Sequence, residues 1–107
     1  MTQFNQREKA FEAKFQNDQE LQFKVTARRN KLLGLWAAQQ LGLDGGDAEA
    51  YAKDVVASDF NEPGDDDVLR KVLQDLTTKN IDATERSVRA EMDRLMGQAK
   101  SEIAAQI

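Results

Sequence analysis

The sequence predicts an all-α fold, a four-helix bundle with a flexible or helical N-terminal arm. The composition is rich in the helix formers Ala, Leu, Lys, Glu, Gln and Arg and sparse in strand formers. Apolar residues recur at intervals of three, four and seven residues, which is the helical period. The 107-residue chain is long enough for one domain. We divide it into an arm over residues 1–19 and a body over residues 20–107.

The stretch from Phe4 to Leu41 contains no proline, and Gly34 is its only glycine. As a single helix it would be about 57 Å long. A compact domain of this size has a radius of gyration of only about 13 Å, so part of the stretch must project or bend back. Asn17 and Asp18 are weak helix formers and good caps, and they mark the predicted seam, where the helix restarts.

The arm carries an aromatic face. Phe4, Phe11 and Phe15 follow one another at intervals of seven and four residues, which places them on one side of a helix. A helix this short is marginal in water, so residues 1–19 are predicted to be disordered alone and to fold on binding. We therefore expect residues 1–17 to make no stable long-range contacts in the free protein. The face either packs back onto the core or docks into a partner's groove. We favour docking because the body has apolar helices of its own.

Charge is distributed unevenly along the chain. Residues 1–31 contain seven Lys and Arg against four Asp and Glu, a net charge of +3. Residues 32–107 contain eight against fifteen, a net charge of −7. A basic arm on an acidic body is typical of an arm that faces a partner, although long helices also vary in charge along their length. Within the arm, the positive charges are Arg7, Lys9 and Lys14.

The second half of the long stretch, residues 20–41, is predicted to be the structural helix of the body. One apolar stripe along it consists of Leu21, Val25, Leu32 and Trp36. A second stripe begins at Phe23 and Ala27 and widens through Leu33, Leu35 and Ala37. By residue 32 the helix is apolar on most sides, which is typical of a core element. Gly42 is a natural left-handed cap at its end.

A second body helix is predicted from Ala48 to Asp59, capped by Asp47 and closed by Phe60 at its exit. Residues 61–64, reading NEPG, form a hard break. The residues of this helix expected to face the core are Tyr51, Ala52, Val55 and Val56.

The third body helix is predicted to begin after Asp65, which caps it, and to end near Lys79 and Asn80. Asp82 or Thr84 caps the fourth, and Asp82 and Glu85 have the spacing of a capping box. The core-facing residues expected for these two helices are Val68, Leu69, Val72, Leu73, Leu76, Val88, Met92, Leu95, Ala99 and Ile103.

Several classes of function are disfavoured. The chain has no cysteine and no histidine, so disulfides, thiolate chemistry and the usual hydrolytic triads are excluded, and no enzyme is predicted. No apolar run is long enough to span a membrane, and no signal peptide is visible. The acidic loop from Asp59 to Asp67 resembles a calcium loop, but Pro63 and Arg70 occupy positions that need ligands, so helix capping is the better interpretation.

The densest basic cluster is Arg28-Arg29-Asn30-Lys31. It is most simply a solvated helix face or a set of ion pairs with the acidic body, and a weak anion or nucleotide site is the alternative. The acidic total disfavours nucleic-acid binding.

Four segments together resemble a known family, the zeta subunit of alphaproteobacterial F-type ATP synthases, a natural ATPase inhibitor. The segments are FNQREKAFEAKF at residues 4–15, TARRNKLLGLW at 26–36, AYAKDVV at 50–56 and EPGD at 62–65. The resemblance covers about the first three-quarters of the chain. The chain departs from the pattern at Asn5, where aspartate is usual, and at Gln39-Gln40, where a charged pair is common.

The resemblance implies a four-helix bundle with an inhibitory N-terminal segment. That segment would enter the catalytic interface between the alpha and beta subunits beside the gamma stalk and block rotation in the direction of ATP hydrolysis. Phe4, Phe11 and Phe15 would be its anchors, and Arg7, Lys9 and Lys14 would pair with acidic groups of the partner.

The implied location is the cytoplasmic face of the inner membrane, reached through the ATP synthase and without direct membrane insertion. No cofactor is required, although weak ATP or ADP binding is expected. The alternative function is a stand-alone helical adaptor with weak adenine-nucleotide binding.

Overall fold

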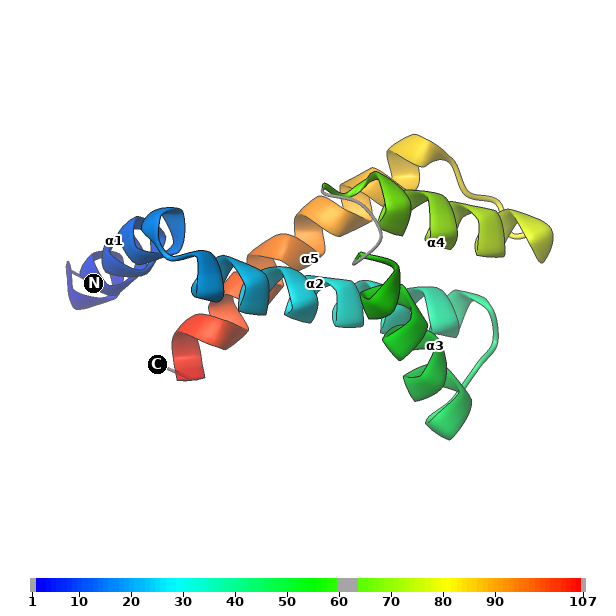
Figure 1. Ribbon diagram of the computed structural model, residues 1–107, viewed down its shortest axis with the longest axis horizontal. Coiled ribbons are helices and arrows are strands. Elements are labelled where there is room, and N and C mark those ends of the chain that lie inside the picture. Colours follow the sequence, from blue (N-terminus) through cyan, green and yellow to red (C-terminus); the bar gives the residue numbers. More distant parts are fainter. Residues whose placement is uncertain (1, 60–63, 107) are drawn as a thin grey trace.

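The computed structural model describes residues 2–59 and 64–106, with side chains from residue 8 onward. Among these residues it contains five helices and no strand (Figure 1). The helices are α1 (Thr2–Asn17), α2 (Gln19–Gln40), α3 (Gly45–Ser58), α4 (Asp66–Thr78) and α5 (Glu85–Gln106). The all-α prediction is confirmed, and the four helices α2 to α5 form the body.

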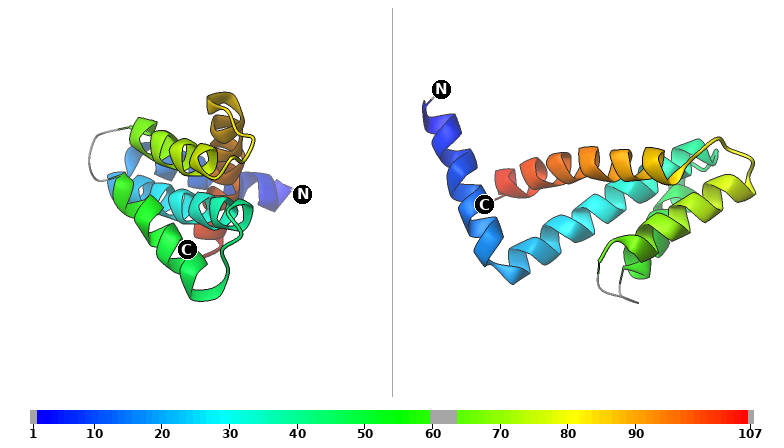
Figure 2. Two further views of the ribbon diagram at one scale, coloured as in Figure 1. Left: turned by 90° about the vertical axis from the view of Figure 1, so that its right-hand side faces the viewer. Right: turned by 90° about the horizontal axis from the view of Figure 1, so that it is seen from above.

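Helix α2 is the central element of the body. It packs most extensively against α3 and next against α5, while α4 contacts α2, α3 and α5. Helix α1 leaves this body at an angle to α2, as the right-hand view of Figure 2 shows. The molecule measures 47 × 29 × 27 Å and has a radius of gyration of 14.9 Å, larger than the value of about 13 Å expected for a compact domain of this length.

The predicted restart of the helix is confirmed at Asp18. Its backbone is extended, at φ −118° and ψ 105°, and its carboxylate accepts a hydrogen bond of 3.1 Å from the backbone N–H of Leu21. From α2, the Gln22 side-chain amide donates to the carbonyls of Phe15 and Gln16, at 2.7 and 3.2 Å. These bonds satisfy groups that both helix ends would otherwise leave without partners.

The buried residues form two clusters. The main cluster is formed by the four helices α2, α3, α4 and α5. It consists of Leu33, Ala37, Val55, Val68, Leu69, Val72, Leu76, Val88, Met92 and Leu95. A smaller one, which we call the distal cluster, lies where α1, α2 and the end of α5 meet. It consists of Leu21, Val25, Ala99 and Ile103, with Phe11, Phe15, Leu32 and Met96 packed against it. The core faces predicted for α4 and α5 are confirmed, except that Leu73 is only partly buried.

The predicted core stripe of α2 is partly wrong. Leu33 is fully buried, whereas Leu32 and Trp36 are only partly buried and Phe23 is 57% exposed. The residues that α2 does bury include Gly34, where α3 approaches closely: a Cβ atom at this position would lie only 2.6 Å from the Cα of Ala52. Trp36 is two positions further on, about 200° around the helix, so it lies on another face of α2 than this crossing.

Two predictions for α3 need correction. Its N-cap is Asp44 rather than Asp47, and Asp47 lies in the first turn, where its N–H bonds to the Asp44 carbonyl at 3.1 Å. The helix ends at Ser58, with Asp59 as its C-cap. The predicted plug at Phe60 and most of the predicted break, residues 61–63, lie outside the described residues.

The start of α5 confirms one of its two predicted caps but not the predicted capping box. The backbone N–H of Ser87 donates to the Thr84 hydroxyl at 3.1 Å, and the Ser87 hydroxyl accepts from the N–H of Thr84 at 2.9 Å. This reciprocal pair is a capping box, so Thr84 is the cap and the predicted box of Asp82 and Glu85 is wrong.

The C-terminal caps are confirmed. Helices α2 and α4 both end in Schellman motifs, with Gly42 at φ 77° and Asn80 at φ 60° in the left-handed position.

Candidate functional site

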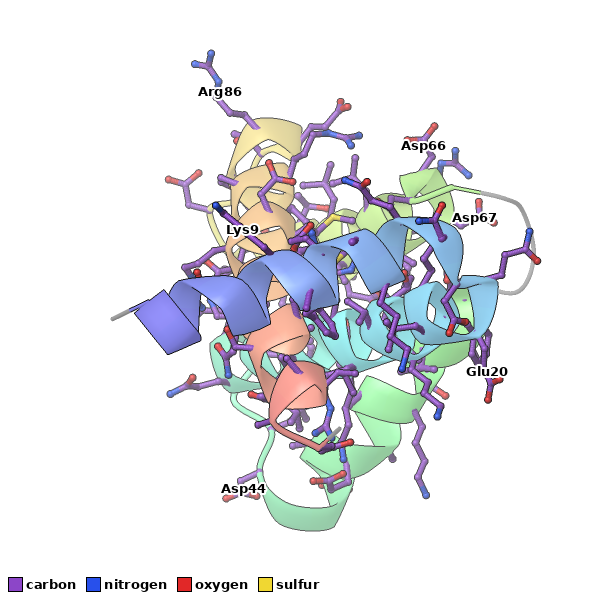
Figure 3. All side chains as sticks on the ribbon, turned by 90° about the vertical axis from the view of Figure 1, so that its left-hand side faces the viewer. Lys9, Glu20, Asp44, Asp66, Asp67 and Arg86 are labelled. Carbon is purple, nitrogen blue, oxygen red and sulfur yellow. The ribbon has the colours of Figure 1, made fainter. Side chains whose placement is uncertain are left out.

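The predicted functional residues lie on α1. Lys9 and Lys14 are exposed, and Figure 3 shows Lys9 projecting from α1. Phe11 and Phe15 are half-buried. The side chains of Phe4 and Arg7 lie outside the described part of the structure. Both lysines are therefore accessible to a partner, whereas two of the three aromatic residues already have contacts within the chain.

The contacts of Phe11 and Phe15 correct one prediction. The two rings stack with centroids 6.3 Å apart and an angle of 23° between their planes, and both pack against the distal cluster. Residues 1–17 were predicted to make no long-range contacts, and this is wrong, because Glu12 and Phe15 contact Lys100, near the other end of the chain. In this conformation Phe11 and Phe15 pack back onto the body, the alternative that the sequence left open.

Lys100 of α5 makes the polar part of this contact. Its Nζ lies 3.3 Å from Oε1 of Glu12 and 4.5 Å from the centroid of the Phe15 ring. The Lys100 side chain is 29% exposed and that of Glu12 is 47% exposed. The Lys100 ammonium group therefore makes both an ion pair and a cation–π contact with α1. Each of these interactions is weak at a partly exposed site.

A groove of about 800 Å³ lies between α1 and the C-terminal half of α5. Its α1 wall includes Glu8, Phe11 and Glu12. Its α5 wall consists of Lys100 and small side chains, namely Gly97, Ser101, Ala104 and Ala105. Because this space is open rather than filled with side chains, α1 touches α5 along one edge and not through a packed helix–helix interface.

The basic cluster at residues 28–31 is largely engaged in ion pairs, as one of its interpretations predicted. Arg29 is only 2% exposed, and its guanidinium donates to both carboxylate oxygens of Asp65, at 2.7 and 3.4 Å. Its Nε donates to Oδ1 of Asn30 at 2.8 Å. Arg28 pairs with Glu102 at 3.4 Å, while Lys31 is exposed. Weak adenine-nucleotide binding stays a prediction.

The burial of Arg29 was not foreseen. The Arg29 side chain links α2 to the N-terminus of α4. Because Asp65 pairs with Arg29, it occupies the cap position of α4 but makes no side-chain cap bond.

Burial raises the pKa of the nearby Asp59 carboxyl, and the Asp65 carboxylate adds to the rise. The Arg29 charge and the Asn30 amide act in the opposite direction. Even so, Nδ2 of Asn30 is buried and has no hydrogen-bond partner among the described residues.

Neither a metal centre nor a membrane span is found among the described residues. They contain no group of three or more acidic side chains placed to hold a metal ion. No described helix is both long and apolar enough to cross a membrane. The calcium interpretation of the Asp59–Asp67 loop involves residues 60–63, which the structure does not describe.

Comparison with known proteins identifies the family. The profile described as ATPase inhibitor subunit zeta matches residues 1–102. One of four matching solved chains, titled "Solution NMR structure of the protein", is 49% identical, with a TM-score of 0.72 over 81% of this chain and 99% of its own. A search of curated proteins found no match. Because the profile extends over nearly all of the sequence, the chain belongs to the family of ATPase inhibitor zeta subunits.

Proposed function

We propose that this chain inhibits ATP hydrolysis by an F-type ATP synthase and that α1 is the element that enters the complex. Membership of an ATPase inhibitor family supports a regulatory rather than a catalytic role. The observation that carries the proposal is the position of α1. It is a separate helix, joined through the single non-helical residue Asp18 to a body that has its own main core, to which no described side chain of α1 contributes.

The proposed point of entry is the catalytic interface between the alpha and beta subunits, next to the gamma subunit. Helix α1 has 16 residues, so it is about 24 Å long. Phe4, Phe11 and Phe15 would anchor it in apolar pockets of the partner, as amphipathic helices do in grooves. The exposed cations Lys9 and Lys14, together with Arg7, would speed association with an acidic surface.

The body is proposed to act as a physical stop. The whole molecule is 27 Å across along its shortest axis, which is much wider than a single helix. Such a body stays outside the interface when α1 enters, and it would obstruct rotation in the hydrolytic direction. The chain would then lie at the cytoplasmic face of the inner membrane through its attachment to the complex.

The test is deletion of residues 1–19, followed by an assay of ATP hydrolysis by the purified ATP synthase. We expect the truncated chain to lose inhibition while keeping its helical circular dichroism, since the main core is outside the deleted segment. Equal inhibition by the truncated and full chains would refute the arm proposal. If neither inhibits, the stand-alone adaptor becomes the better explanation.

A matched pair of charge reversals refines the test. Lys9→Glu changes an exposed cation on α1, and Lys31→Glu changes an exposed cation on α2. We expect Lys9→Glu to slow association with the synthase several-fold at low salt, because steering depends on the charge of the inserting segment. Lys31→Glu should have little effect. Equal effects of the two reversals would mean that net charge, and not α1, governs association.

A further inference from the structure

We propose that the contact between α1 and the C-terminal half of α5 is an autoinhibitory latch, which holds the arm against the body until the arm is released into the ATP synthase. The proposal rests on the proposed function of α1. It adds that the structure described above is the closed, non-inhibiting conformation of the chain.

The first argument is competition for the same side chains. Phe11 and Phe15 are the described members of the proposed anchor set, and both pack against the distal cluster. A ring that is packed against the distal cluster cannot also fill a pocket of another protein. Closing onto α5 and docking into a partner are therefore mutually exclusive states of α1, and the partner has to select the open one.

The second argument is the chemistry of the contact. Lys100 is held by the Glu12 carboxylate at 3.3 Å and covers the Phe15 ring at 4.5 Å. Both interactions act between α5 and α1, and both are lost when the helices separate. Neither is deeply buried, since Glu12 is about half exposed. A contact of this kind favours the closed state without making it permanent.

The third argument is that little else holds α1 to α5. The groove between them is open, and its α5 wall is formed mostly of small side chains such as Gly97 and Ser101. At the other end, α1 is attached to α2 through the Gln22 amide, which bonds the carbonyls of Phe15 and Gln16. Helix α1 can therefore leave α5 by turning at Asp18 while the main core stays intact.

The latch is tested in the full chain by NMR relaxation of the backbone amides of residues 8–17. The variant Lys100→Met removes the charge and keeps an apolar stem over Phe15. The matched control is Lys24→Met, which removes an exposed lysine paired with Glu20 at 3.8 Å within α2. We expect Lys100→Met to increase the open population of α1 about three- to tenfold, the combined effect of one ion pair and one cation–π contact. Lys24→Met should leave it unchanged.

Two further variants examine the pairing itself. Glu12→Lys places two cations together and should open the arm. Combining it with Lys100→Glu restores the ion pair with reversed polarity and should close the arm again, although the cation–π contact is lost. Sodium chloride at high concentration should loosen the wild-type arm by screening the partly exposed pair, and it should have less effect on Lys100→Met.

The functional readout is the concentration of the chain that gives half-maximal inhibition of ATP hydrolysis. Where the closed state dominates, this concentration falls in proportion to the rise in the open population, so Lys100→Met should inhibit about three- to tenfold better. Unchanged relaxation of residues 8–17 in Lys100→Met would overturn the latch. A looser arm without better inhibition would overturn its autoinhibitory role. Failure of the proposed function is recognised separately, by full inhibition from the chain that lacks residues 1–19.

Discussion

The crossing of α2 over α3 gives the sharpest stability prediction, because two helical glycines in this chain have opposite surroundings. A Cβ atom at Gly34 would lie 2.6 Å from the Cα of Ala52 and 3.3 Å from the Cβ of Val55. A Cβ atom at Gly97, in α5, would meet no atom of the described residues within 4 Å. Alanine substitution therefore adds the same methyl group to a helix at both positions, in a crowded environment at Gly34 and in an open one at Gly97.

The expected magnitudes follow from two terms. Replacing a mid-helix glycine by alanine stabilises a helix by about 0.8–1 kcal/mol, and this gain applies at both positions. At Gly34 the new methyl group also forces α3 away from α2, because its nearest neighbour is backbone and cannot rotate aside, and overpacking of this kind costs about 1–3 kcal/mol. Gly97→Ala should therefore raise the free energy of unfolding, while Gly34→Ala should leave it unchanged or lower it by up to about 2 kcal/mol.

The assay is urea and thermal unfolding of both variants and the wild type, followed by circular dichroism. The quantity that decides is the difference in unfolding free energy between the two variants, since the helix-propensity term cancels in it. We expect a difference of about 1–3 kcal/mol, or roughly 4–20 °C in Tm for a domain of this size. Equal stabilisation by both substitutions would refute the close approach of α2 and α3 at Gly34.

Three other predictions concern the body. Leu33→Ala should cost about 2–5 kcal/mol of unfolding free energy and Leu32→Ala clearly less, because only Leu33 is fully buried; equal losses in urea titrations would contradict this assignment of the core. Arg29→Ala should cost about 1–3 kcal/mol, below the usual loss for a broken buried pair because Asp65 is 42% exposed and stays solvated. The control Arg28→Ala should cost under about 1 kcal/mol. Asp59→Asn should stabilise the chain at pH 7, since the raised pKa of Asp59 means that folding penalises its charged form. The gain should shrink as the pH falls through the raised pKa, and a gain independent of pH between 7 and 4 would exclude this cause.

Local signals in the sequence were enough to place most helix ends. Asp18, Gly42 and Asn80 act through bonds to residues within a few positions of them, so their roles can be predicted without knowing the fold. Thr84 was one of two predicted caps, and the choice between them depended on which side chain met Ser87. The error at Asp44 has a similar origin, since two flexible glycines follow it and hide the start of α3.

Contacts between distant segments could not be predicted in this way. Arg29 looked like part of a solvated basic cluster because its partner, Asp65, lies 36 residues further along. Leu33 is buried more deeply than Leu32 and Trp36 because α3 and α5 approach α2 from different sides. The packing of Phe11 and Phe15 depends on the end of α5, whose position relative to α1 no local pattern reveals.

The single extended residue between α1 and α2 also has a geometric consequence. A rigid rod turning about one end carries its far end through an arc that grows with its length. For a helix of 16 residues, about 24 Å long, a rotation of about 30° at Asp18 displaces the far end by about 12 Å. Small torsional changes in one peptide segment are thus amplified into a sweep comparable to the diameter of a helix. The body can stay in one position while the tip of α1 reaches widely separated points.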